Sequence, residues 1–516
     1  MTHYTRFILA AISLLIPALA LLVPGASAAG TANAAGPDYT RIDRYLSSQI
    51  SSAHIPGAAL GIVHGTQIVH LYGTGDADSS GRTITPQTPF ILGSVSKSFT
   101  ALAVMQLVQA HRVRLDAPVR RYLPAFRLAD GGAYTRITVR QLLTHTSGIP
   151  KSAGTDPLHG PQTTLAAQVH ALASVRSGTP GAHYEYSNAN YEVLGLAVQT
   201  VSGEPFGTYI QQHIFAALDM RHSYVTEATA QRAGLTQGHI LYFGYPVARR
   251  AFYRADFLPA GFLVSTAADM THYLTAQMNG GRYEHASVLS PAGIAALHHP
   301  EVDAGGPLKS RYGMGWITST VGGRSLLWHD GSSYGMHTFM AIDPHTRWGV
   351  IVLFNGSSPL YELLNTEDAI GWNVMGMADG FPGQGTLEGL YIGFDAMVLL
   401  TTLLTLRTLV TLLRGRTPSP PRWSFLAALL TRRTPERLKW VWRLYSCAVV
   451  PVVVLIELPR LLDAPWPALV KTDIGLWLLV IAGLRLLIGA AWLARAVRAR
   501  SRVTREPSES PAPLPA

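Results

Sequence analysis

The chain has 516 residues, enough for a large domain with a full core and a further segment. Its formal net charge is +10, and the excess lies in residues 390–516, which hold 17 Lys and Arg against 7 Asp and Glu. Positive charge confined to segments beside apolar runs argues against a nucleic-acid partner and indicates a membrane surface. The single cysteine, Cys447, excludes an internal disulfide and a cysteine-rich metal site.

The first 28 residues have the pattern of a secretory signal peptide. Arg6 provides a basic start, residues 7–23 form an apolar run, and Ala-Ser-Ala ends at position 28. Since the apolar run is slightly long, an uncleaved anchor is the alternative. In both cases the segment that follows is exported.

Residues 38–375 have the composition and patterning of a mixed α and β globular domain. Strand patterns lie near both ends, and helical patterns lie between them, so we expect an α+β fold whose sheet is closed by the two chain ends. The expected elements are a helix at 39–54, two strands within 59–73, helices at 94–111 and 139–143, a helix from about 191, and three strands within 325–356 with tight turns at Gly331 and Pro344.

Three apolar runs follow a glycine-rich linker at 376–389. The runs cover residues 390–413, 440–462 and 473–495, each about long enough to cross a bilayer core. Residues 414–439 hold seven Lys and Arg and one Glu, and the proline-rich tail 496–516, expected to be disordered, is also basic at its start. By the positive-inside rule, the connection and the tail are cytoplasmic. The globular domain then lies outside, in a multi-pass protein of the cell membrane.

Charged residues within the apolar runs leave one question open. Those near the ends of the runs can extend toward the membrane surface. Arg485 falls near the middle of the third run. It pairs within the bundle, with Glu457 as a candidate, or it faces a membrane-protein partner.

The stretch from Ile91 to Gln109, ILGSVSKSFTALAVMQLVQ, carries one charge, Lys97, three residues after Ser94. Ser-x-x-Lys alone is a weak signal, since Ser94 could cap a helix and Lys97 could be solvated. However, the surroundings are apolar, and an apolar site lowers the pKa of a lysine so that it can act as a base. A serine nucleophile needs such a base beside it. The chain contains no P-loop, dinucleotide-binding or His-Glu-x-x-His motif, so neither a cofactor nor a metal is expected.

Two later motifs complete a pattern. Tyr186-Ser187-Asn188 and His329-Asp330-Gly331 follow Ser94-Val95-Ser96-Lys97 in an order that resembles the serine β-lactamase and penicillin-binding protein superfamily. The resemblance covers about residues 38–375 and is closest to the class C-like branch of lactamases, esterases and D-amino-acid peptidases. It implies an antiparallel sheet flanked by helices, with a helical subdomain.

The resemblance also implies roles for individual residues. Ser94 would be the nucleophile, Lys97 its base, and Tyr186 a group that shares or relays the proton. The oxyanion would be bound by the backbone N–H groups of Ser94 and Ser332. The remaining site residues that it implies are Asn188, His329 and Gly331.

One position departs from the pattern of lactamases. Their third motif usually begins with lysine, whereas this chain has His329. A histidine is mostly neutral near pH 7 and offers no fixed charge to a substrate carboxylate. This difference favours esterase- and aminopeptidase-like relatives over enzymes that act on β-lactams or on D-Ala-D-Ala.

Two other residues compete for catalytic roles. Gly331-Ser332-Ser333-Tyr334-Gly335 matches the Gly-x-Ser-x-Gly nucleophile elbow, but an elbow must lead into a helix, and a strand pattern follows here. Ser333 is therefore not the expected nucleophile. We expect His145 to be a structural or site-rim residue rather than a base.

The sequence thus predicts an exported, membrane-anchored serine hydrolase that forms an acyl-enzyme with a small-molecule or peptide amide or ester, as a D-amino-acid peptidase or an esterase would. A domain of this fold followed by three helices resembles the prodrug-activating peptidases of nonribosomal peptide pathways. The alternatives are a β-lactamase or D-Ala-D-Ala carboxypeptidase, a membrane sensor that is acylated but does not turn over, and a transport accessory that binds without chemistry.

Overall fold

The computed structural model describes residues 36–129, 131–153, 163–242, 244–249, 253–306, 308–333, 335–357, 366–383, 390–414, 455–456 and 473–503. The chain divides into two compact units, one from Leu22 to Glu388 and one that includes Gly389–Ala516. The predicted signal peptide lies outside the described residues. So does the second predicted apolar run, 440–462, apart from residues 455–456.

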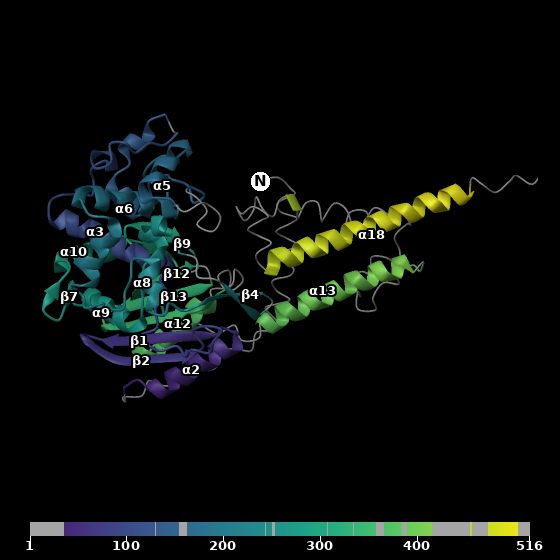
Figure 1. Ribbon diagram of the computed structural model, residues 1–516, viewed down its shortest axis with the longest axis horizontal. Coiled ribbons are helices and arrows are strands. Elements are labelled where there is room, and N and C mark those ends of the chain that lie inside the picture. Colours follow the sequence, from purple (N-terminus) through teal and green to yellow (C-terminus); the bar gives the residue numbers. More distant parts are fainter. Residues whose placement is uncertain are drawn as a thin grey trace, which may run out of the picture. The chain divides into compact units, whose positions relative to one another are not determined.

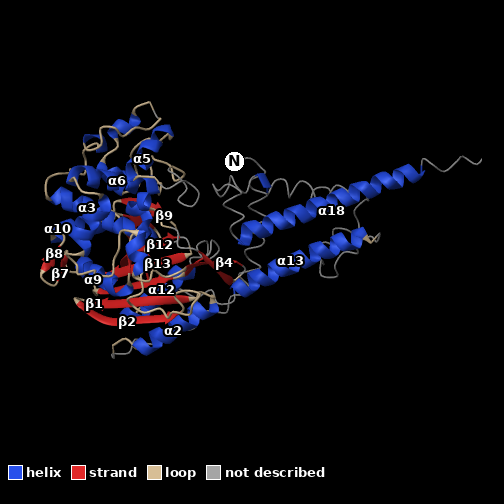
Figure 2. Ribbon diagram, in the orientation of Figure 1, coloured by secondary structure: helices blue, strands red, loops and turns tan. Residues whose placement is uncertain are grey.

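The first unit contains an eight-stranded antiparallel sheet (Figure 2). Its strand order is β2-β1-β14-β13-β12-β11-β10-β9. The strands are β1 Gly57–His64, β2 Gln67–Gly75, β9 Val302–Gly305, β10 Ser310–Tyr312, β11 Ile317–Val321, β12 Arg324–Ser333, β13 Met336–Asp343 and β14 Trp348–Phe354. Because β1 pairs with β14, the two ends of the domain close the sheet, and this part of the prediction is confirmed.

Helices cover both faces of this sheet. Helix α12 (Thr366–Asp379) packs on β13, where a Cβ at Gly371 would lie within 3 Å of the Phe339 ring. Helix α9 (Ala267–Met278) packs on β1, where a Cβ at Gly61 would lie 2.5 Å from Thr271. Phe339 pairs with Val352 of β14, whereas Gly61 pairs with its neighbour Ile351. Successive residues of a strand face opposite sides, so α12 and α9 lie on opposite faces.

The remaining helices form most of the segment between β2 and β9 (Figure 1). The first helix, α2 (Tyr39–Ser52), instead packs with α12. The others are α3 Ser96–Gln109, α4 Val139–Leu143, α5 Leu165–Ala171, α6 Asn188–Ser202, α7 Phe206–Ile210, α8 Glu227–Arg232 and α10 Pro291–His298. Three small sheets complete the domain: β3 (Phe90–Ile91) with β6 (Val264–Ser265), β15 (Gly356–Ser357) with β4 (Gly238–Tyr242) and β5 (Tyr245–Arg249), and β7 (Arg282–Tyr283) with β8 (Ala286–Ser287).

Several expected features differ from the structure. Helix α12 continues to Asp379, into the predicted linker 376–389, and α18 continues to Val503, into the tail that was expected to be disordered. Helix α6 begins at Asn188, three residues before the expected start, because the helical backbone follows directly on the extended residue Ser187. Gly331 is not a turn: β12 continues through it, and the chain reverses near Gly335, whose φ is +78°. The glycine at position 331 does not mark a turn. Its lack of a side chain instead allows the backbone near Ser94 to approach strand β12 closely, as described below.

The second unit contains two long helices, α13 (Leu390–Leu413) and α18 (Asp473–Val503). They pack against each other, with Ile488 of α18 in contact with Leu409, and they run in the same direction (Figure 1). Among the described residues, one helical segment, Gly475–Ala494, is long and apolar enough to cross a membrane, and Val398–Thr411 is a shorter apolar helix. The three predicted spans are therefore not confirmed.

Candidate active site

Ser94 lies in the 3-10 turn η1 (Gly93–Val95), which leads directly into α3. The start of a helix offers unpaired backbone N–H groups and the positive end of the helix dipole. Gly93 has a φ of +56°, a left-handed conformation that glycine adopts without strain. A Cβ at this position would also lie 2.5 Å from the carbonyl carbon of Gly331. Glycine is thus required where this turn meets strand β12.

The turn occupies the open edge of β12. Strand β11 pairs with β12 only from Arg324 to Trp328, and η1 contacts the strand beyond that point. A Cβ at Gly331 would lie 2.9 Å from the backbone nitrogen of Ser94, and one at Gly93 would lie 2.7 Å from that of Ser332. The segments that carry these two amides are therefore in direct contact, as an oxyanion hole built from them requires.

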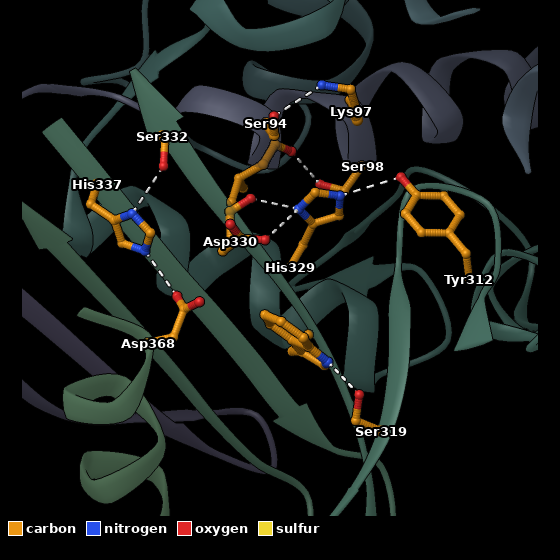
Figure 3. Close-up of polar contacts among 12 residues, drawn as sticks. Ser94, Lys97, Ser98, Tyr312, Ser319, His329, Asp330, Ser332, His337 and Asp368 are labelled. Atoms are coloured by element: carbon orange, nitrogen blue, oxygen red, sulfur yellow. Dashed lines mark hydrogen bonds and ion pairs between the residues drawn. The ribbon is translucent and has the colours of Figure 1, made fainter. Parts of the chain in front are cut away.

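Lys97 is fully buried and makes three hydrogen bonds through Nζ. It donates to Ser94 Oγ at 3.0 Å, to Asn188 Oδ1 at 2.8 Å and to the carbonyl oxygen of Ala260 at 2.6 Å (Figure 3 shows the contact with Ser94). Burial lowers the pKa of Lys97 to about 7, although the carboxylates of Glu192 and Asp330 oppose this shift. A lysine with this pKa is available as a base near neutral pH.

Tyr186 closes the other side of the Ser94–Lys97 pair. Lys97 Nζ lies 4.9 Å from the centre of its ring, and a hydrogen bond joins its hydroxyl group to that of Ser94. Burial raises the pKa of Tyr186 well above 10. The group is therefore a neutral phenol near neutral pH, which can pass a proton along but does not rest as a phenolate. Asn188 opens helix α6 two residues later, and α6 packs on α3.

His329 is buried on the same strand as Gly331 and Ser332. Its Nε2 lies 3.3 Å from the Tyr312 hydroxyl, and its Nδ1 donates to the carbonyl oxygen of Asp330 at 2.6 Å. Burial lowers the pKa of His329, and the positive charge of Lys97 acts in the same direction. The imidazole is thus neutral near pH 7, as the sequence suggested.

His145 is fully buried and has a structural position. Its Nδ1 accepts hydrogen bonds from the backbone N–H of Ser187 at 3.2 Å and from Asn190 at 3.0 Å. Its ring packs 4.4 Å from that of Tyr186. Burial lowers the pKa of His145 well below its usual value. It holds the segment that carries Tyr186 and Asn188, rather than contacting Ser94.

Ser333 does not occupy a nucleophile elbow. It ends strand β12, and the chain continues through Gly335 into strand β13, whereas an elbow leads into a helix. Its hydroxyl is buried and has no hydrogen-bond partner among the described residues. The structure brings Ser94, Lys97, Tyr186, Asn188 and the His329–Ser332 segment together, and it gives Ser333 no base.

Two groups beside Lys97 were missed by the sequence analysis. The carbonyl oxygen of Ala260, in the π-helical turn η7 (Leu258–Phe262), is a backbone acceptor and leaves no signal in residue type. Glu192 is fully buried, one helical turn after Asn188, and its carboxyl oxygens have no hydrogen-bond partner among the described residues. Burial raises its pKa to about 8 against the attraction of Lys97. The sequence did contain a signal for Glu192, because an acidic residue stands within an otherwise apolar stretch of α6.

A third missed feature is a chain of hydrogen bonds behind the oxyanion strand. Ser332 Oγ lies 3.2 Å from His337 Nδ1, and His337 Nε2 lies 2.8 Å from Asp368 Oδ1 (Figure 3). Asp330, His337 and Asp368 also form the one group of described side chains close enough to share a metal ion, with ligand atoms within 4.8 Å of one another. The ion pair between His337 and Asp368 already accounts for the proximity of those two residues.

Comparison with known proteins agrees with this geometry. The protein-family model described as Beta-lactamase matches residues 42–370. The chain belongs to the β-lactamase family. It is therefore a serine hydrolase of the β-lactamase and penicillin-binding protein type, with the α+β fold that the sequence predicted.

Two curated members of this family show how far the similarity extends. Protein flp of Staphylococcus aureus strain MW2 is 28% identical over 336 residues, which cover 63% of this chain and 66% of flp. Penicillin-binding protein 4 of Amycolatopsis lactamdurans is 28% identical over 313 residues, or 59% of this chain and 81% of that protein. The chain thus spans about two thirds of the length of flp.

Solved structures of the family show the same fold. The octameric penicillin-binding protein homologue from Pyrococcus abyssi matches with a TM-score of 0.56 and 26% identity, over 64% of this chain and 78% of that chain. D-amino acid amidase from Ochrobactrum anthropi SV3 matches with a TM-score of 0.56 and 22% identity, over 66% and 97% of the two chains. At this identity the likeness to the amidase concerns the fold alone.

Proposed function

We propose that this protein is a membrane-anchored hydrolase that cleaves an amide or ester through an acyl-enzyme on Ser94. The observation that carries the proposal is the position of Lys97, which is fully buried, has a lowered pKa, and lies 3.0 Å from Ser94 Oγ. A solvated lysine in a structural role would keep its ordinary pKa. A buried amine beside a serine is suited to removing the proton of that serine.

The proposed reaction has two halves. Lys97 takes the hydroxyl proton while Ser94 Oγ bonds to the substrate carbonyl carbon, and the carbonyl electron pair moves to oxygen. The backbone N–H groups of Ser94 and Ser332 stabilise this oxyanion. As the tetrahedral intermediate collapses, the leaving nitrogen or oxygen receives a proton from Lys97 through Tyr186. Water then attacks the acyl-enzyme in the same manner, which releases the acid and restores the Ser94 hydroxyl.

The proposed substrates are those of a D-amino-acid peptidase, amidase or esterase. The neutral His329 offers no cation to a substrate carboxylate, and the charged His337 behind the third motif is buried and paired with Asp368. This disfavours a β-lactamase or a D-Ala-D-Ala carboxypeptidase. Assays with esters, β-lactams and N-acyl-D-amino-acid amides would separate the classes.

We also propose that the second unit anchors the catalytic domain outside the cytoplasm. Helix α13 has the bounds of the first predicted apolar run, whereas α18 begins with the third run at Asp473 and continues beyond it to Val503. The two helices run in the same direction. If two parallel neighbours both cross a bilayer, the segment between them must cross it once in the opposite direction. This supports the proposal of a further span at 440–462. The proposed pairing of Arg485 involves Glu457, which lies outside the described residues.

Covalent labelling tests the central assignment. A fluorophosphonate probe should add once to the wild-type protein, at Ser94, as measured by intact-mass spectrometry and peptide mapping. Ser94→Ala should abolish both labelling and turnover. Ser333→Ala is the matched control and should be labelled at the wild-type rate. An adduct on Ser333, or turnover that survives Ser94→Ala, would contradict the proposal.

A further inference from the structure

The hydrogen bonds from Ser332 to Asp368 connect the end of strand β12 that lies against turn η1 with helix α12. Ser332 and His337 are cross-strand partners in β12 and β13, so their side chains share the face covered by α12. His337 is buried, whereas Ser332 is partly exposed. Asp368, in the first turn of α12, accepts a hydrogen bond from His337 Nε2 at 2.8 Å. Each nitrogen of His337 thus has one partner.

The protonation state of His337 decides the direction of the hydrogen bond to Ser332. In a neutral imidazole with its proton on Nε2, Nδ1 accepts the hydrogen bond that the Ser332 hydroxyl group donates. In an imidazolium, Nδ1–H donates to Ser332 Oγ, and the hydroxyl hydrogen is left to bind another group. When His337 is protonated, the Ser332 hydroxyl group is therefore free to donate a hydrogen bond to another group. When His337 is neutral, the Ser332 hydroxyl hydrogen is already bonded to Nδ1.

Carboxylates around His337 favour the imidazolium. Asp368 and Glu367 face it from α12, and Asp330 faces it from β12, while the neighbouring side chain from β14 is the apolar Phe354. Their attraction overcomes burial and raises the pKa of His337 to about 10. The charged form then prevails throughout the neutral range.

We propose that His337, held as an imidazolium by Asp368, turns the Ser332 hydroxyl into a hydrogen-bond donor for an oxygen of the substrate. This makes Ser332 a specificity-determining residue through its side chain, beyond the oxyanion role proposed for its backbone N–H. His337 and Asp368 act through Ser332 as positioning residues. The inference rests on the proposed function, since it needs an acyl group bound at Ser94.

The charges nearby define which oxygen the hydroxyl binds. Asp330, whose side chain is 37% exposed, carries a carboxyl group beside Ser332 on the same face of β12. A substrate carboxylate would be repelled there, whereas a neutral amide carbonyl would not. The inferred substrate therefore carries an amide carbonyl close to the scissile acyl carbon, as an N-acylated amino acid derivative does.

A matched pair of covalent probes tests this inference without knowledge of the natural substrate. The two diphenyl alkylphosphonates differ only in an acetamido group on the carbon next to phosphorus, and each labels the serine by displacing phenol. The measured quantity is the ratio of their rate constants for labelling Ser94, followed by intact-mass spectrometry. Ser332→Ala, which keeps the backbone N–H, should lower this ratio roughly fivefold, the effect of one hydrogen bond. Ser333→Ala should keep the wild-type ratio.

The pH dependence of the same ratio tests the role of His337. In the wild-type protein the ratio should be constant from pH 6 to pH 8.5, because His337 stays protonated. In Asp368→Asn the pKa of His337 falls, so the ratio should drop as the pH rises through this range. A ratio that is unaffected by Ser332→Ala, or a flat profile in a folded Asp368→Asn protein, would overturn the inference alone. Failure of both probes and of a fluorophosphonate to label wild-type Ser94 would overturn the proposed function as well.

Discussion

Lys97 and Tyr186 handle the same proton in the proposed mechanism, and this predicts a specific pattern of mutational effects. Lys97→Ala and Tyr186→Phe should each slow acylation of Ser94 by about 10²–10⁴-fold, the usual contribution of acid–base groups. Combining them should cost little more, because residues that act as one unit are non-additive. Single-turnover rates measure the effect, with Tyr209→Phe, on α7, as the control. Multiplicative losses in the double variant would argue against a shared proton path.

The acidic limb of the kcat/KM profile should report the titration of Lys97. With a pKa of about 7, Lys97 is the free amine above that value, so kcat/KM should rise as the pH increases through 7. Burial raises the pKa of Glu192 to about 8, so Glu192 is mostly a neutral carboxylic acid while Lys97 titrates. Glu192→Gln keeps a neutral side chain of the same shape and should therefore leave the acidic limb near pH 7.

The other charges that act on Glu192 set the controls for this experiment. Arg254 and Asp256, from the turn η6 (Ala255–Phe257) and the residue before it, form a buried ion pair with N–O distance 2.6 Å. Helix α4 also packs on α6, and its Arg140 forms ion pairs with Asp116 and Glu301. Glu204→Gln, at a half-buried acidic residue beyond the end of α6 that pairs with His213, is the matched control. If Glu192→Gln moves the acidic limb to lower pH and Glu204→Gln does not, Glu192 is ionised while Lys97 titrates, and the expectation is wrong.

At the scale of elements, activity depends on how closely turn η1 approaches strand β12. A Cβ at Gly331 would lie 2.9 Å from the backbone nitrogen of Ser94, so Gly331→Ala must push the two segments apart. Misplacing one oxyanion donor costs about 10²–10³ in rate. We expect a loss of kcat of this size with a smaller loss of thermal stability, measured by turnover and by circular dichroism. Full activity in Gly331→Ala would show that the oxyanion is stabilised elsewhere.

At the scale of the whole molecule, the uneven charge predicts the membrane topology. Residues 414–439 and the tail hold most of the basic excess, which the positive-inside rule assigns to the cytoplasm. Reporter fusions at Pro418 and in the tail should be active only as cytoplasmic reporters. A fusion at Pro465 should be active only as an exported reporter. The opposite pattern, or an exported signal from the tail, would refute the three-span topology.

The features that depend on local periodicity and spacing were predictable from the order of residues. Ser94 and Lys97 lie three residues apart at the start of a helix, so their contact follows from helical geometry. The strands at both ends of the domain and the helices between them follow from apolar periods of two and of 3.6 residues. The neutral state of His329 followed from its residue type, and burial strengthens it.

The groups from distant parts of the chain that contact these residues could not be predicted and are known from the packing of the elements. The third acceptor of Lys97 is the backbone carbonyl of Ala260, 163 residues away, and a backbone atom has no signature in residue type. Gly331 resembled a turn because glycine is common in turns, yet it serves a close approach between two elements. The series of hydrogen bonds from Ser332 through His337 to Asp368 joins two strands and a helix, and nothing in the spacing of these residues predicts it. Local patterns are fixed by neighbours along the chain, whereas such contacts depend on how the elements pack.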